Sequence, residues 1–169
     1  MSETLPLVSI VMPVKNEGLY INDAFDRIDE QDYPRERIEL IVVDGASSDN
    51  TVAIIRDRMK NDERIKLIPG TYNCPAAMNA GIEIANGSLI AKIDGHGYIN
   101  EKFVSIAVSY LVSYPEYSCI GGRIVPLAND PVSLANMYAR FSKFGVASGI
   151  YTAKKEIHIT DTVQCGVYT

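Results

Sequence analysis

The sequence predicts an α/β fold in which a mostly parallel central sheet carries helices on both faces. Three observations lead to this prediction. Four short apolar segments lack the strict alternation of half-exposed strands, as strands buried in parallel sheets do. Segments of helical character lie between them. Polar turn residues follow three of the four directly, which is typical of alternating strands and helices joined by right-handed crossovers.

The composition is that of a single globular domain and argues against several classes of protein. The 169 residues are 47% hydrophobic and 22% charged, enough for a substantial core. The net charge of -5 argues against nucleic-acid binding. Three scattered cysteines without a C-x-x-C pair fit a reducing cytoplasm better than a disulfide framework. Neither a signal peptide nor a run of about 18 apolar residues is present.

The first two predicted strands are residues 7–14 (LVSIVMPV) and 38–43 (IELIVV). The segment 20–31 between them is predicted to be a helix, because four apolar residues recur at helical spacing and form one stripe. They are Ile21, Ala24, Phe25 and Ile28. The loop at 44–49 (DGASSD) is rich in turn formers and helix N-cap residues, so a second helix is expected over 50–59.

The later elements continue this alternation and then lose regularity. A third strand is expected at 65–68, a helix at 76–86 and a fourth strand at 89–93. Beyond them we expect helices at 103–113 and 133–143 and strands at 119–125 and 162–168. Because the chain stops at a predicted strand, we expect it to be part of a longer domain.

Polar residues gather where three predicted strands end, at 15–17, 44–49 and 94–96. The carboxyl ends of parallel strands share one edge of a sheet, and ligands bind at that edge. These loops should therefore converge on one site.

Asp94 and His96 are the candidate metal ligands in this site. Asp94 offers a carboxylate oxygen and His96 an imidazole nitrogen, a combination that suits Mn²⁺ and, through the carboxylate, Mg²⁺. Gly95 between them permits close approach of a ligand to the backbone. The alternative is a β-hairpin, because Asp-Gly between apolar runs is a favoured two-residue turn.

Other residues near the strand ends are candidates for binding a nucleotide. Asp44 could accept hydrogen bonds from a base or ribose, or cap a helix. Asn16 and Glu17 could contact a ribose or base edge, or cap the first helix. Asn79 is a poor helix former in a predicted helix, and Lys92 could face a phosphate or reach solvent.

Five segments together resemble family 2 glycosyltransferases in order and spacing. They are VSIVMPVKNE, the pair YP at 33–34, LIVVDGASSDNT, AAMNAGIEIANG and AKIDGH. The DGH variant and GGRIVP at 121–126 resemble bacterial exopolysaccharide enzymes of the succinoglycan type.

This resemblance implies a GT-A fold and an inverting, hexosyl-type transferase of polysaccharide synthesis that uses a UDP-sugar with Mn²⁺ or Mg²⁺. Pro13, Val14, Asn16 and Glu17 would line the nucleoside pocket, and Asp44 would bind the base. Asn79 would lie in the helix beside the diphosphate. Asp94 and His96 would stand where the family has Asp-x-Asp, with histidine replacing the second aspartate.

The resemblance also implies an acceptor side. The acceptor would be a saccharide or a lipid-linked saccharide, and an aspartate or glutamate would deprotonate its hydroxyl. Asp161 is the late candidate for this base. Residues 1–100 would form the nucleotide-sugar half and 101–169 an incomplete acceptor half. Attachment to the inner face of the plasma membrane would need a part beyond Thr169.

Two other functions stay open at this point. A sugar nucleotidyltransferase shares the architecture, but PVKNEG after the first strand has only one lysine and one glycine for cradling a triphosphate. A nucleotide-binding domain that is catalytically incomplete is the second alternative.

Overall fold

The computed structural model describes residues 5–122, 130–142, 163 and 165–169. Most described residues belong to a unit that runs to Ile120 and includes Cys165–Thr169, and a second unit lies within residues 121–164. The strands are β1 (Val8–Val14), β2 (Ile38–Gly45), β3 (Ile65–Gly70), β4 (Leu89–Lys92), β5 (Cys119–Gly121) and β6 (Gly166–Tyr168). The helices are α1 (Ile21–Asp29), α2 (Thr51–Met59), α3 (Cys74–Glu83), α4 (Phe103–Ser113) and α5 (Pro131–Phe141). Arg35–Arg37 forms a 3₁₀ turn.

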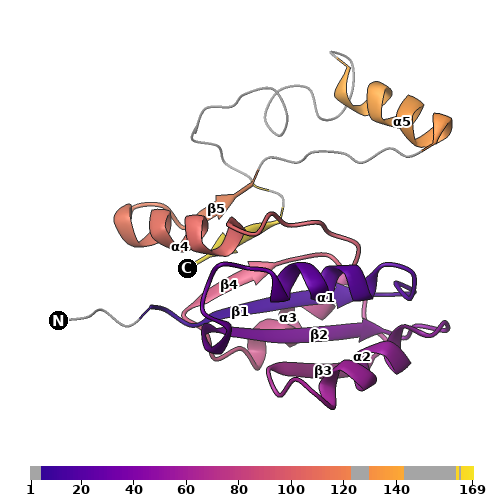
Figure 1. The fold of residues 1–169 in the computed structure, drawn as a ribbon, viewed down its shortest axis with the longest axis horizontal. Helices are drawn as coiled ribbons and strands as arrows, with labels where there is room; N and C mark the ends of the chain where they lie inside the picture. The colour runs from indigo at the N-terminus through magenta and orange to yellow at the C-terminus, as the bar shows by residue number, and fades with distance from the viewer. Residues whose placement is uncertain (1–4, 123–129, 143–162, 164) are drawn as a thin grey trace. The chain divides into compact units, whose positions relative to one another are not determined.

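The six strands form one sheet in the order β3-β2-β1-β4-β6-β5 (Figure 1). Strand β1 pairs in parallel with both β2 and β4, and β6 pairs antiparallel with β4. The predicted α/β class and mostly parallel sheet are confirmed. The chain moves outward from β1 to β3 and then returns to the other side of β1, so the strand order reverses between β1 and β4.

Helices cover both faces of the sheet. Alternate residues of β1 and β2, such as Ile10, Met12 and Val42, pack with α1, α2 and α4 in the larger core cluster. The opposite set, including Val11 and Ile41, packs with α3. The burial of β1 and β2 on both faces explains why apolar residues dominate these strands without strict alternation. The predicted stripe of α1 is also confirmed, because all four of its residues are buried.

Most predicted elements are present, with shifted ends. Strand β2 runs two residues further than predicted because Asp44 and Gly45 still pair with β3. Helix α3 begins earlier than predicted, since the Asn73 side chain accepts the Ala76 N–H and Pro75 lies in the first turn. The helix expected at 133–143 is α5, and Asp130 caps it with Ser133 in a capping box. Residues 123–125 of a predicted strand lie outside the described part.

A buried polar network ties the amino ends of the strands together. Glu39 of β2 accepts hydrogen bonds from the Ser9 hydroxyl at 2.6 Å and the Asn86 N–H at 2.9 Å, and it pairs with Lys66. Burial raises the pKa of Glu39, but these donors outweigh it and lower the pKa to about 2. Ser9 also accepts the Gly87 N–H at 2.8 Å, so the network joins β1, β2, β3 and the turn before β4.

We expect this network to make the free energy of unfolding fall at low pH. The unfolded glutamate, with a pKa of about 4.5, binds protons more readily than the folded one, with a pKa of about 2. The stabilisation is therefore complete above pH 4.5 and is lost as the pH falls toward 2, by at most about 3 kcal/mol. Glu39→Gln should lower the free energy of unfolding at pH 7 and flatten its fall between pH 5 and pH 2, as measured by urea titration.

The matched control is Glu36→Gln, which removes an exposed carboxylate from the 3₁₀ turn beside β2. The free energy of unfolding of Glu36→Gln should depend on pH as that of the wild type does. Parallel profiles for the wild type and Glu39→Gln would contradict the role assigned to Glu39.

Candidate nucleotide-sugar site at the carboxyl edge of the sheet

The point where the strand order reverses lies between β1 and β4, and the loops that follow these strands flank it. In open α/β sheets ligands bind outside the carboxyl ends of the strands at such a reversal. The predicted convergence of the loops at 15–17, 44–49 and 94–96 can be followed in their hydrogen bonds.

The loops after β1 and β2 are interlocked. The Asn16 N–H donates to the Ser47 hydroxyl at 2.9 Å, and the Ser48 N–H donates back to the Asn16 side-chain oxygen at 2.8 Å. The Gly18 N–H donates to Asp49 at 3.0 Å. Asn16 has a φ of 57°, a left-handed conformation that asparagine tolerates better than most residues. Its side chain is therefore held in place by the loop that follows Asp44.

Asp44 is deeply buried at the end of β2. It is 3% exposed and lies in register with Val14 of β1, which follows Pro13. Both of its carboxylate oxygens accept the Ser47 N–H, at 3.1 and 3.3 Å. A carboxylate has lone pairs for further donors, so Asp44 can still accept an N–H or O–H from a ligand. Ala46, two residues after Asp44, has a φ of 61°. This left-handed conformation is strained for alanine, and strained residues of this kind cluster at functional sites.

Asp94 is held from two sides just beyond β4. The Lys92 ammonium donates to one carboxylate oxygen at 2.6 Å, and the Cys165 thiol lies 3.7 Å from the other. Burial lowers the pKa of Lys92, but the bond to Asp94 outweighs it and raises the pKa. Burial, followed by the Asp94 charge, raises the pKa of the Cys165 thiol and keeps it protonated.

His96 bonds to Glu17 and not to Asp94. Its Nδ1 lies 2.8 Å from a carboxylate oxygen of Glu17, across the reversal of strand order. Asp94 and Gly97 close a tight turn through an N–H to C=O bond of 2.8 Å. This turn leads on toward α4 and not into an adjacent antiparallel strand, so the hairpin alternative is wrong.

Asn79 is the predicted site residue that lies on a helix. It is exposed and lies in the middle of α3. Asp161 lies outside the described residues and stays a prediction. Cys165 is a contact of Asp94 that the sequence did not indicate, because β6 comes more than 70 residues after Asp94 in the chain.

The residues present fit a divalent cation in part. Across the ranges that the structure describes, no group of three or more His, Cys, Asp or Glu side chains is arranged to hold a metal. Asp94 and His96 could supply two ligands, and Mg²⁺ and Mn²⁺ commonly take their others from phosphate oxygens and water. The donor set therefore fits a cation that arrives with a diphosphate better than one held by protein alone.

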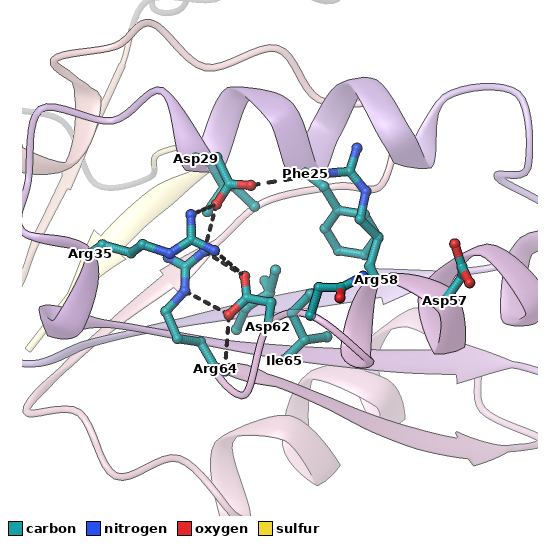
Figure 2. A pocket seen from close by; sticks show the side chains of 11 residues that line it. Phe25, Asp29, Arg35, Asp57, Arg58, Asp62, Arg64 and Ile65 are labelled. Carbon is teal, nitrogen blue, oxygen red and sulfur yellow. Dashed lines mark hydrogen bonds and ion pairs between the residues drawn. The ribbon is translucent and has the colours of Figure 1, made fainter.

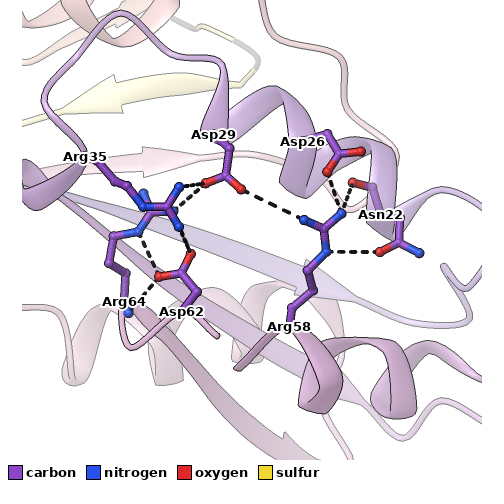
Figure 3. Close-up of polar contacts among 7 residues, drawn as sticks. All are labelled: Asn22, Asp26, Asp29, Arg35, Arg58, Asp62 and Arg64. Carbon is purple, nitrogen blue, oxygen red and sulfur yellow. Dashed lines mark hydrogen bonds and ion pairs between the residues drawn. The ribbon is translucent and has the colours of Figure 1, made fainter. Parts of the chain in front are cut away.

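A small polar pocket lies at the opposite edge of the sheet (Figure 2). It holds about 200 Å³; Arg64 in it precedes β3 directly, and Arg35 opens the 3₁₀ turn that precedes β2. Figure 3 shows Asp29 between arginines: it accepts Arg35 at 2.8 Å and lies 3.9 Å from Arg58. Asp62 pairs with Arg35 at 2.8 Å and Arg64 at 2.6 Å.

Most charged groups in this pocket pair with one another, although the Nη1 atom of Arg64 is buried without a hydrogen-bond partner among the described residues. Asp29 and Asp62 are paired with arginines, Asp57 pairs with Lys60, and the volume is below the roughly 300–1,000 Å³ of ordinary ligand pockets. We infer that the cluster stabilises the junction of α1, α2 and the amino ends of β2 and β3.

Asp29→Asn tests this structural role. It should lower the free energy of unfolding by about 1–2 kcal/mol, because partly exposed ion pairs contribute modestly and three arginines lose one partner. Asp57→Asn is the control, since its exposed pair with Lys60 should contribute almost nothing. Urea titration measures both. Nucleotide-sugar affinity that falls in Asp29→Asn alone, with stability unchanged, would place a binding site here.

Comparisons with known proteins agree with this geometry. Residues 9–161 match the family described as Glycosyl transferase family 2. The chain is 28% identical over 155 residues to Glycosyltransferase AglE of Haloferax volcanii, covering 89% of this chain and 50% of that protein. It is 29% identical over 169 residues to a Methanococcus voltae enzyme, covering 95% and 52%. That enzyme is dolichyl N-acetyl-alpha-D-glucosaminyl phosphate 3-beta-D-2,3-diacetamido-2,3-dideoxy-beta-D-glucuronosyltransferase.

The fold is similar to a solved glycosyltransferase structure. Mannosyltransferase PcManGT from Pyrobaculum calidifontis, in complex with GDP-Man and Mn²⁺, matches with a TM-score of 0.65 and 25% identity. The match covers 81% of this chain and 39% of that one. This chain therefore belongs to the family 2 glycosyltransferases and has the GT-A fold. It spans about half the length of the curated relatives it matches. The match over residues 9–161 shows the family, and the relatives are varied glycosyltransferases that do not show the succinoglycan-type subgroup.

Proposed function

We propose that this chain binds a nucleoside diphosphate sugar, with uridine as the expected nucleoside, at the carboxyl edge between β1 and β4. The protein it belongs to would transfer the sugar, with inversion, to a saccharide or lipid-linked saccharide in polysaccharide synthesis. The observation that carries the proposal is the meeting of the β1 and β4 loops at the reversal of strand order, through Glu17 and His96.

Six of the candidate residues have surroundings that support a role in donor binding. Val14 and the Asn16 loop would form one wall of the nucleoside pocket, and buried Asp44 would accept an N–H of the base. Lys92 supplies positive charge toward the diphosphate in a chain whose net charge is -5. Asp94 and His96 would hold Mn²⁺ or Mg²⁺, which when bound supplies charge that offsets the departing diphosphate.

The transfer itself would take place at the anomeric carbon of the donor. An acceptor hydroxyl oxygen forms the new bond to this carbon as the bond to the diphosphate oxygen breaks, and a carboxylate takes the hydroxyl proton. Asp161 is the proposed carboxylate, and residues 101–169 are proposed as the acceptor half. The Methanococcus voltae relative, whose name states a dolichyl phosphate-linked sugar, supports a lipid-linked acceptor.

The site of action proposed is the cytoplasmic face of a membrane. All three cysteines are free thiols, as expected in a reducing compartment. None of the helices in the described ranges combines the length and apolarity needed to cross a bilayer.

Donor binding by the chain is the first test. UDP-sugars and GDP-sugars are compared with Mn²⁺ in a thermal-shift assay and by calorimetry. At about 100-fold excess over Kd, the preferred donor should raise Tm by about 5–10 °C. Asp94→Asn, which keeps the shape but loses the charge, should weaken binding roughly tenfold or more.

Asp23→Asn is the matched control, because Asp23 is an exposed carboxylate on α1 whose bond goes to the Tyr98 hydroxyl. It should bind the donor as the wild type does. The proposal fails if no nucleotide sugar of either base binds, or if Asp94→Asn and Asp23→Asn bind equally well.

A further inference from the structure

Backbone hydrogen bonds on both sides fix the position of Glu17 in the loop after β1. Its N–H donates to the Thr51 hydroxyl at 2.8 Å, and its C=O accepts the N–H groups of Tyr20 and Ile21 at 2.9 and 2.8 Å. The Thr51 hydroxyl in turn donates to Asp49, which lowers the pKa of that carboxyl. The Glu17 backbone is thus tied both to the start of α1 and to the loop after β2.

The Glu17 side chain also lies against the turn that carries His96. A Cβ at Gly95 would come within 2.9 Å of Val14 and 3.0 Å of the Glu17 Cγ, so a larger residue would push the two loops apart. The Glu17 side chain is 16% exposed, whereas the His96 side chain is 61% exposed. The carboxylate is therefore enclosed, and the imidazole extends from it toward solvent.

This arrangement determines which nitrogen of His96 is available. An ionised carboxylate only accepts hydrogen bonds, so the 2.8 Å contact requires a proton on Nδ1. In a neutral imidazole with a proton on Nδ1, the lone pair is on Nε2. A carboxylate on the far nitrogen also makes the ring a better ligand and orients it.

We propose that Glu17 is a positioning residue that holds His96 in the Nδ1–H tautomer and presents Nε2 to the cation of the donor complex. The inference rests on the proposed function and assigns Glu17 a role different from lining the nucleoside pocket. It also gives the histidine in the second ligand position a carboxylate partner on the far side of its ring.

The first measurement needs neither metal nor donor. Nitrogen-15 NMR of the two histidines at about pH 8.5, where histidine is neutral, distinguishes Nδ1–H from Nε2–H. His96→Gln assigns the signals. Wild-type His96 should show Nδ1–H. Glu17→Ala should give a mixture of tautomers, whereas Glu17→Gln, which keeps an acceptor oxygen, should retain Nδ1–H.

The second measurement follows Mn²⁺ binding in the presence of UDP by electron paramagnetic resonance. Glu17→Ala should weaken Mn²⁺ binding roughly tenfold, and Glu17→Ala combined with His96→Gln should be no weaker than His96→Gln alone. Asp23→Ala is the control for the loss of a nearby carboxylate and should change neither measurement.

An Nε2–H tautomer in the wild type, or an unchanged tautomer in Glu17→Ala, would overturn the proposal. Additive losses in the double variant would do the same, because Glu17 would then act independently of His96. A wild type that binds no nucleotide would contradict the proposed function alone, and the tautomer measurement would still decide the role of Glu17.

Discussion

Strand β1 is buried on both faces and hydrogen-bonded along both edges, to β2 on one side and β4 on the other. A strand in this position cannot place charged side chains along its length without heavy desolvation, so its chemistry has to be at its ends. The reversal of strand order also occurs beside β1, which brings the loop after β4 next to the loop after β1. The position of the candidate site follows from these two facts.

The two ends of the central strands are used differently. At the amino ends, Glu39 and Asp29 are surrounded by donors or arginines that satisfy them, which is the arrangement of a structural network. At the carboxyl ends, Asp94 and His96 have partners that fix their positions yet leave lone pairs for a ligand. Asn16, Ala46 and Cys165 are all in left-handed conformations at this edge. Backbone strain and unfilled hydrogen-bonding capacity therefore occur together.

Much of the fold and the location of the candidate site could be predicted from the sequence, because the patterns that indicate them lie within short segments. The mostly apolar runs of β1 and β2, the stripe of α1 and the polar residues after three of the strands indicated the fold and one functional edge. Two features could not be predicted, because each depends on contacts between residues that are far apart in the sequence. The Glu39 network needs Ser9, Lys66 and Asn86 to meet, and a charged residue in an apolar run gives no sign of its partners. The Glu17–His96 bond joins residues 79 positions apart, so the sequence indicated two candidates but not their contact.

The location of the diphosphate and its cation is tested most directly by paramagnetic broadening. Amide NMR signals of the 169-residue chain are recorded with UDP and then with a small fraction of Mn²⁺, which broadens signals from nearby residues. We expect the amides of residues 94–97 and 16–18 to broaden first and those around Asp29 and Asp62 to stay sharp. Broadening that begins around Asp29 and Asp62, at the opposite edge of the sheet, would contradict the assignment of the site.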